Sequence, residues 1–224
     1  MGKGKTAGNL FIAVGCILIA GALGLYIYNT ETAGNAGRES EAAVSAFMNH
    51  ISDIHSENTE NAGGMLPDSY EPVVFSMTEK CTSENESPEN AAEEMSVFEA
   101  DGFSFAAVIE IPALNLILPV CSEFSMDTLK HYPCIYSGSV NENDIIIAAH
   151  NYDSHFGNIK SLQFGDEIIL TDAAGNRILY QVTETEVISG DRADDMKSGS
   201  WDMTLFSCNL SGRSRITVRL KRKN

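Results

Sequence analysis

The pattern of apolar and polar residues divides the chain into three parts, and the first has the character of a membrane anchor. Residues 10–28 carry no charge. As a helix, this run would span roughly 28 Å, close to the thickness of a bilayer's hydrocarbon core. Lys3 and Lys5 precede it and acidic residues follow, so the positive-inside rule predicts that residues 1–9 are cytoplasmic. A cleaved signal peptide has a shorter apolar core followed by its cleavage site, whereas the one Ala-x-Ala match, at Ala20 and Ala22, lies inside the run.

Residues 29–100 have the composition of a stalk. They are rich in Glu, Asn, Ser, Ala and Gly and poor in large apolar side chains. Such a composition gives little burial to offset the entropy of ordering, so we expect a segment that is partly helical or disordered. Apolar residues at helical spacing over 41–54 predict one short helix within it. His50 and His55 are interpreted as solvated side chains of that helix rather than as metal ligands.

Residues 101–224 alternate short apolar runs with turn residues, which indicates a sheet. The expected strands are 103–111, 114–120, 144–149, 167–171, 177–188, 203–207 and 215–220. Short strands with tight connections, and no long amphipathic helix, predict an all-β sandwich or barrel. Short helical turns are expected around 158–162 and 193–197.

Composition and charge narrow the class of protein. A chain of 224 residues with 43% hydrophobic content makes one ordinary domain, with or without an appendage. The formal net charge of −16 argues against a nucleic-acid partner, whose phosphates require Lys and Arg. Most of the acidity belongs to the stalk, where residues 31–100 hold fifteen Asp and Glu against Arg38 and Lys80.

The cysteines do not form a recognisable framework. There are five, at irregular spacing and without a C-x-x-C pair, so neither a disulfide scaffold nor a zinc site is predicted. Cys121 and Cys134 could form a bridge, but each adjoins an apparent strand and we favour two free thiols. Cys16 is interpreted as a small apolar residue of the anchor. Cys81, in the stalk, has no assigned role.

Three residues at the ends of expected strands carry chemistry. Cys208 ends the run TLFSC, His150 follows the apolar run IIIAA, and Arg215 opens the last strand. A cysteine nucleophile needs a thiolate and a proton donor for the leaving amine, and imidazole suits the second role. A guanidinium can stabilise the oxyanion because it never deprotonates. We therefore expect these three strand ends to converge on one rim.

Each of these residues alone has a simpler reading. A lone cysteine at a strand end is more often structural, and a lone histidine after an apolar strand is more often a capping group. Arginines in the basic C-terminal strand usually form a solvated face. His131 and His155 are weaker candidates for the histidine role, because neither follows an apolar strand.

Together, however, the motifs resemble the sortases, the membrane-bound cysteine transpeptidases of Gram-positive surfaces. The resemblance covers roughly residues 103–223 and rests on AAHN around His150, TLFSC at Cys208 and SRITVR around Arg215. The stretches IEIPALNLILPV and FGNIKSLQFGDEIILTD are also similar to the family. There are three departures: Ser207 replaces a threonine, Ala149 stands where glycine is frequent, and Arg213 competes with Arg215 for the arginine role.

The resemblance implies an eight-stranded closed β-barrel over residues 101–224, with its site on the rim. Cys208 would attack a C-terminal motif resembling Leu-Pro-x-Thr-Gly and form a thioacyl enzyme. His150 would then move protons at both amines, and Arg215 would hold the oxyanion. Substrate binding is expected along four further residues: Thr204, Leu205, Ser207 and Asn151.

The same resemblance implies partners and a location. The partners would be surface proteins that bear the motif, and a peptidoglycan precursor or a pilin amine would be the acceptor. No metal-ligand set is visible, and we predict no required cofactor. The protein would sit in the cell membrane by a single pass, with its catalytic domain outside.

Two other classes stay open at this point. An L,D-transpeptidase would also use a cysteine, but its Ser-x-Gly-Cys type motif precedes its histidine pattern, whereas here His150 lies upstream of Cys208. A membrane-tethered binding or adhesion domain would have no nucleophile, and Cys208 would then be a buried strand residue. The reactivity of this thiol in the folded protein distinguishes the enzymes from the binding domain.

Overall fold

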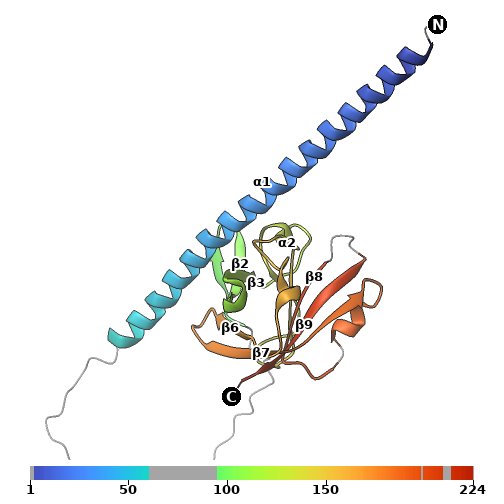
Figure 1. Ribbon diagram of the computed structural model, residues 1–224. Helices are drawn as coiled ribbons and strands as arrows, with labels where there is room; N and C mark the ends of the chain where they lie inside the picture. Colours follow the sequence, from blue (N-terminus) through green and yellow to red (C-terminus); the bar gives the residue numbers. More distant parts are fainter. Residues whose placement is uncertain (1–2, 61–94, 198, 209–212, 224) are drawn as a thin grey trace, which may run out of the picture.

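The computed structural model describes residues 3–60, 95–197, 199–208 and 213–223 (Figure 1). One long helix, α1 (Lys3–Glu60), runs along one side of a sheet domain that begins at β1. Cys81 and the rest of the expected stalk between 61 and 94 lie outside the described residues.

The sheet is a barrel. The described strands are β1 (Phe98–Ala100), β2 (Phe103–Ile111), β3 (Leu116–Cys121), β4 (Cys134–Ser137), β5 (Ile145–Ala149), β6 (Glu167–Asp172), β7 (Arg177–Ser189), β8 (Met203–Cys208) and β9 (Ser214–Arg222). They pair in the order β1-β2-β3-β4-β5-β8-β9-β7-β6, and β6 also pairs with β2. The pairing of β6 with β2 closes eight strands into a barrel and leaves β1 as an additional edge strand, so the expected closed all-β barrel is confirmed.

Short helices fill the connections. These are η1 (Pro112–Leu114), α2 (Thr128–His131), η2 (Ile159–Ser161) and η3 (Ala193–Lys197). The helical turns expected around 158–162 and 193–197 are present as η2 and η3. The apparent strand noted from the sequence at Cys134 is present as β4, which is only four residues long.

The barrel wall is apolar on both sides near β5 and β8. Ile145 and Ile147 of β5 lie in the interior core, and so does Leu205 of β8. The alternate residues of these strands belong to a second cluster on the outside of the wall, which we call the outer cluster; it consists of Ile146, Ala148, Ile188, Met196 and Phe206. A strand buried on both faces reads as a continuous apolar run, which explains the sequence IIIAA of β5.

Helix α1 is part of the globular structure as well as a candidate anchor. Beyond its apolar run it carries a stripe of small and aromatic residues that is buried against the barrel: Ala36, Ser40, Ala43, Phe47 and Ile51. Their spacing of three and four residues places them on one face of the helix. The helix contacts β1, β2, β3 and α2, and Phe47 packs edge to face on Phe98 with ring centroids 5.9 Å apart. Since α1 ends at Glu60, the first part of the expected stalk, residues 29–60, is helical.

The N-terminal part of α1 contacts none of this core. By length and composition, α1 is long and apolar enough to cross a membrane, and the apolar stretch that qualifies it is entirely exposed. It projects beyond the barrel toward the N-terminus (Figure 1).

Candidate functional site

The strand register brings the three chemically interesting residues together at one end of the barrel. Strands β5 and β8 are parallel neighbours, and their last pair is Ala149 with Ser207. His150 and Cys208 follow this pair on the two strands. On the other side of β8, Cys208 pairs directly with Arg215 of the antiparallel strand β9. The histidine, the cysteine and the arginine therefore occupy one level on three adjacent strands.

The alternation of side chains places all three on the outside of the barrel wall. Ala148 and Phe206 belong to the outer cluster, and His150 and Cys208 lie two residues further along the same strands. Arg215 pairs across the sheet with Ile188, another member of the outer cluster. Side chains two apart on a strand, and those of a direct cross-strand pair, share a face. Cys208 is exposed there, so its thiol is accessible.

His150 is held by the residues that follow it. Its Nδ1 lies 3.0 Å from Oδ1 of Asn151, and the Asn151 backbone N–H donates to Nδ1 at 3.1 Å. Its ring stacks on Tyr152, with centroids 4.1 Å apart and planes inclined by 14°. Burial lowers the pKa of His150 below its ordinary value, and the hydrogen bond to Asn151 offsets part of this effect. The imidazole is therefore fixed in orientation and predominantly neutral at pH 7.

Tyr152 was not among the residues expected from the sequence. An aromatic ring two positions after a histidine is a weak signal, because the stacking depends on how the loop turns. That turn is set by three backbone hydrogen bonds: the N–H of Phe156 donates to the carbonyl of His150, and the N–H groups of His155 and Gly157 donate to the carbonyl of Tyr152. A side chain at Gly157 would collide with the carbonyl of Tyr152, so glycine is needed there.

Arg215 is half-buried and anchored to the neighbouring strand end. Its Nη1 donates to the carbonyl of Gly190 at 2.8 Å. Gly190 in turn donates its N–H to the carbonyl of Arg213 at 2.8 Å. Arg215 is at the level of Cys208, whereas Arg213 lies two residues before that level. The side chain of Arg213 is exposed.

The four residues expected to bind substrate occupy different places. Asn151 contacts the His150 ring. Thr204 is on the outer face, but it is buried and accepts a hydrogen bond from Arg219. Leu205 points into the interior core. Ser207 is buried and donates to the carbonyl of Phe156 at 3.1 Å, which ties β8 to the loop after His150. The structure thus brings Asn151 to the site, and it places Leu205 and Ser207 on the opposite face of β8 from Cys208.

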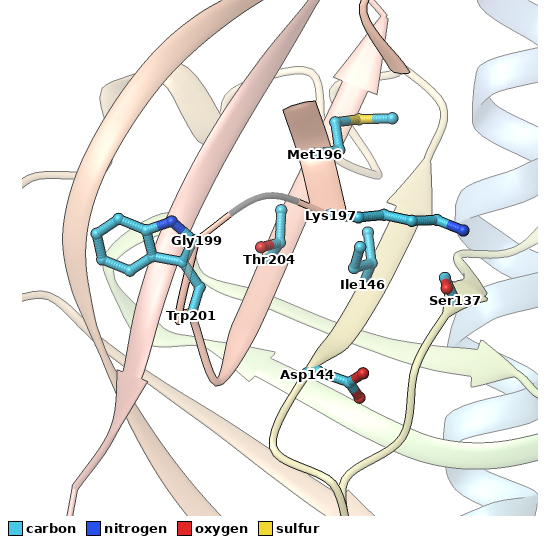
Figure 2. Close-up of a pocket in the computed structure, with 8 residues that line it drawn as sticks. All are labelled: Ser137, Asp144, Ile146, Met196, Lys197, Gly199, Trp201 and Thr204. Atoms are coloured by element: carbon cyan, nitrogen blue, oxygen red, sulfur yellow. The ribbon is translucent and has the colours of Figure 1, made fainter. Parts of the chain in front are cut away.

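A pocket lies on the same outer face, further from the cysteine. It is lined by Ser137, Asp144, Ile146, Met196, Lys197, Gly199, Trp201 and Thr204. Ile146 and Thr204 are register partners on β5 and β8, and they form its floor, with Lys197 and Trp201 on opposite sides (Figure 2). Cys208 is four residues beyond Thr204, which corresponds to about 13 Å along the strand. The pocket and the cysteine therefore lie on the same outer face of β8, with the buried Phe206 between them.

One wall of this pocket is fastened by a buried arginine. Arg219 is 2% exposed. It donates to the carbonyls of Met196 and Asp195 in η3, at 2.6 and 2.7 Å, and its Nε donates to Glu186 at 2.7 Å. From the sequence, a solvated face was the simpler reading for arginines of this strand, because nothing in the sequence shows that η3 folds over β9.

The remaining cysteines are not part of this site. Cys121 and Cys134 are free, buried thiols that pair in register between β3 and β4. The hydrogen bond between the two thiols and their burial raise the pKa of Cys121 well above its usual range. Within the described parts of the chain, no group of three or more His, Cys, Asp or Glu side chains is arranged to hold a metal ion.

Comparison with known proteins identifies the family. The family model of the Sortase domain matches residues 109–223, slightly more than half of the chain, and the protein belongs to the sortase family. Membership of this family supports a transpeptidase activity for the chain. No curated protein matches the chain.

Solved sortase structures share the fold. Sortase C1 from Streptococcus agalactiae is 22% identical, with a TM-score of 0.50, and the match covers 56% of this chain and 71% of that one. A Clostridium perfringens sortase D5 transpeptidase is 25% identical, with a TM-score of 0.48 and coverage of 54% and 79%. Sortase C from Clostridium perfringens SM101 is 26% identical, with a TM-score of 0.45 and coverage of 54% and 70%.

Proposed function

We propose that this protein is a cysteine transpeptidase that cleaves a C-terminal sorting motif resembling Leu-Pro-x-Thr-Gly and joins the released carbonyl to an amine. The observation that carries the proposal is the common level of Cys208, His150 and Arg215 on three adjacent strands. A binding domain without a nucleophile would bury the cysteine as a strand residue, whereas Cys208 is exposed. Membership of the sortase family supports the same reaction class.

In the first half of the reaction, the Cys208 sulfur attacks the carbonyl carbon of the scissile peptide bond. The thiol proton passes to His150, whose lowered pKa keeps the imidazole free to accept it. The Arg215 guanidinium, fixed by its bond to Gly190, donates to the oxyanion of the tetrahedral intermediate. His150 then protonates the leaving amine, and a thioacyl enzyme remains.

In the second half, an incoming amine attacks the thioester. His150 removes a proton from this amine, and the Cys208 thiolate leaves as the new amide forms. The acceptor is a peptidoglycan precursor or a pilin amine. Nucleophile, acid–base and oxyanion roles are all filled by side chains, and we propose that the reaction needs no cofactor.

The substrate lies along the outer face of β5 and β8. An extended peptide advances roughly 3.3 Å per residue, so residues three to four positions before the scissile bond reach the pocket about 13 Å from Cys208. Ile146 and Met196 offer an apolar floor and wall there for an aliphatic side chain. In this arrangement Thr204, Leu205 and Ser207 support the strand that carries the nucleophile.

The domain organisation follows from this assignment. Residues 1–9 are cytoplasmic, 10–28 form the membrane anchor, 29–100 connect it to the barrel, and 101–224 form the extracellular catalytic domain. Its protein partners are surface proteins that carry the sorting motif.

The test is cleavage of sorting-motif peptides by the full chain in detergent. Cys208→Ala should abolish cleavage and the thioacyl species detected by intact mass, and His150→Ala should nearly abolish turnover. Arg215→Ala should cost about 3–4 kcal/mol of transition-state stabilisation, as is typical for an oxyanion donor. Arg213→Ala is the matched control and should cost far less; equal losses at both arginines would refute the assignment of Arg215.

A further inference from the structure

The contacts between α1 and the barrel show which end of the barrel lies nearer to the apolar run of the helix. Near the apolar run, the carbonyl of Ala33 accepts a hydrogen bond from Ser154 at 3.1 Å, and Ser40 Oγ lies 3.4 Å from His155 Nε2. Ser154 and His155 belong to the loop that holds His150. At the far end of the contact, a side chain at Gly175, in the turn between β6 and β7, would meet the ring of His55. The catalytic end of the barrel is therefore the end nearest the candidate anchor.

The short helix α2 contacts the same stretch of α1, between Ala33 and Ser40. His131 pairs with Glu39 of α1 at 2.7 Å. Lys130, in the same helix, forms an ion pair with Asp127 at 2.7 Å, which raises the pKa of Lys130. In Figure 1, α2 sits on the part of the barrel that faces the N-terminal half of α1.

The helix rise of about 1.5 Å per residue gives the height of each contact above the membrane, counted from Tyr28. From Tyr28 to Ala33 the helix advances five residues, or about 7.5 Å. The headgroup layer on each side of a bilayer is roughly 5–7 Å thick. The Ser154 level therefore coincides with the outer boundary of the headgroups. His55 is 27 residues beyond Tyr28, or about 40 Å, which places the turn between β6 and β7 well away from the membrane.

The side chains presented at this level suit a lipid surface. Met126 is 69% exposed and Phe124 is 38% exposed, in the loop that leads into α2. The Lys130 side chain is 58% exposed. An exposed apolar side chain close to an exposed lysine is a pattern of interfacial membrane contacts.

We propose that residues 124–130, the interfacial segment, contact the phospholipid headgroups of the bilayer that α1 crosses, so that the catalytic end of the barrel faces the membrane. This inference rests on the anchoring role in the proposed function. The Cys208 level then lies close to the lipid surface, and a substrate tethered to the same membrane presents its motif there without having to reach around the barrel.

The experiment uses the full chain in vesicles of palmitoyl-oleoyl phosphatidylglycerol and phosphatidylcholine, with brominated lipids as fluorescence quenchers. Trp201 is the single tryptophan, so Trp201→Phe gives a silent background. Met126→Trp in this background reports the interfacial segment. Val97→Trp is the matched control, because Val97 is also exposed and adjoins Phe98, which packs on α1 at Phe47. Phe47 is nineteen residues beyond Tyr28, or about 28 Å further along the helix.

The expected result is a loss of emission for tryptophan at 126 and none at 97 or for native Trp201. A second variant carries a seven-residue helical insertion after Asn29, which raises the barrel by about 10 Å while nearly keeping its orientation around the helix. This insertion should remove the quenching at 126. In the chain that keeps Trp201, the same insertion should leave cleavage of soluble peptides unchanged and slow cleavage of a peptide anchored in the same vesicle.

The outcomes separate this inference from the proposed function. If the protein floats with the vesicles and cleaves peptides, but tryptophan at 126 is not quenched, the membrane-facing orientation is wrong and the transpeptidase proposal stands. If tryptophan at 126 is quenched but the native chain, with Trp201 in place, cleaves no peptide, the orientation holds and the transpeptidase proposal fails. If the protein does not float with the vesicles, the anchor is wrong and the orientation falls with it. Circular dichroism verifies that each variant is folded.

Discussion

Replacing Arg219 with methionine should loosen the wall of the outer pocket while leaving the nucleophile in place. Arg219 is one of the largest fully buried side chains, and it joins three elements. It binds two carbonyls of η3, Glu186 of β7 and the hydroxyl of Thr204 on β8. Methionine fills much of the same volume but donates no hydrogen bond. The two η3 carbonyls and Thr204 would then lose the donor they share.

The expected cost follows from these contacts. Removing one partner of a buried charged network costs about 3–5 kcal/mol. Glu186 is 37% exposed, so water can solvate its carboxylate once Arg219 is gone. We therefore expect the lower end of the range, about 3 kcal/mol in the free energy of unfolding, which corresponds to roughly 10 °C in Tm for a protein of this size.

The assay combines denaturation with kinetics. Trp201 lines the same pocket, so its emission reports the local change during urea unfolding of the detergent-solubilised chain. For motif peptides, KM should rise more than kcat falls, because the pocket wall moves while Cys208 and His150 stay. Arg222→Met is the matched control: Arg222 is on the same strand but exposed, and its change should cost less than about 0.5 kcal/mol. Equal destabilisation by the two substitutions would refute the anchoring role of Arg219.

Two further predictions concern the pH dependence that His155 causes and the accessibility of the thiols. Burial lowers the pKa of His155 to about 4 from its ordinary value of 6.5. Its contribution to stability is therefore complete above pH 6.5 and is lost as the pH falls toward 4. Between pH 7 and 4.5 the native chain should lose about 2 kcal/mol more unfolding free energy than His155→Gln, measured in urea; an equal loss would contradict the assignment. A thiol reagent should modify Cys208 in the folded chain, whereas Cys121 and Cys134 should react only after unfolding, as mapped by peptide mass; labelling of Cys121 in the native state would be evidence against its burial.

The sequence was informative where local pattern and chemistry coincide. The continuous apolar run of β5 and the run that ends at Cys208 both indicated buried strands, and the structure places their ends at one level. The expectation that Leu205 and Ser207 bind substrate did not use the alternation of a strand. Counting back from an outward-facing Cys208 puts both residues on the inner face. That conclusion was available from the sequence without coordinates.

Other features depend on contacts that no local pattern records. The stripe of α1 from Ala36 to Ile51 consists mainly of small residues, and its composition resembles that of a solvated stalk. This stripe is buried because β1 and β3 pack against it, and only the tertiary structure shows that contact. Arg219 is a similar case, since a basic strand normally indicates a solvated face and η3 reverses this at one position. In both cases tertiary packing overrides the expectation from composition.

Helix α1 continues without a break from the apolar run to the residues that contact the barrel. This limits how far the barrel can move relative to the apolar run. A flexible connection over residues 29–100 would let the barrel move through roughly 45 Å around its anchor, since the root-mean-square span grows with the square root of length. Contacts at Ala33, Ser40 and Phe47 instead fix the barrel to the helix within a few turns of Tyr28. If α1 anchors the protein as proposed, the helix then sets both the height and the direction of the site. Because effective concentration depends on this geometry, substrates held in the same membrane gain an advantage over soluble peptides that contact with the catalytic residues alone does not provide.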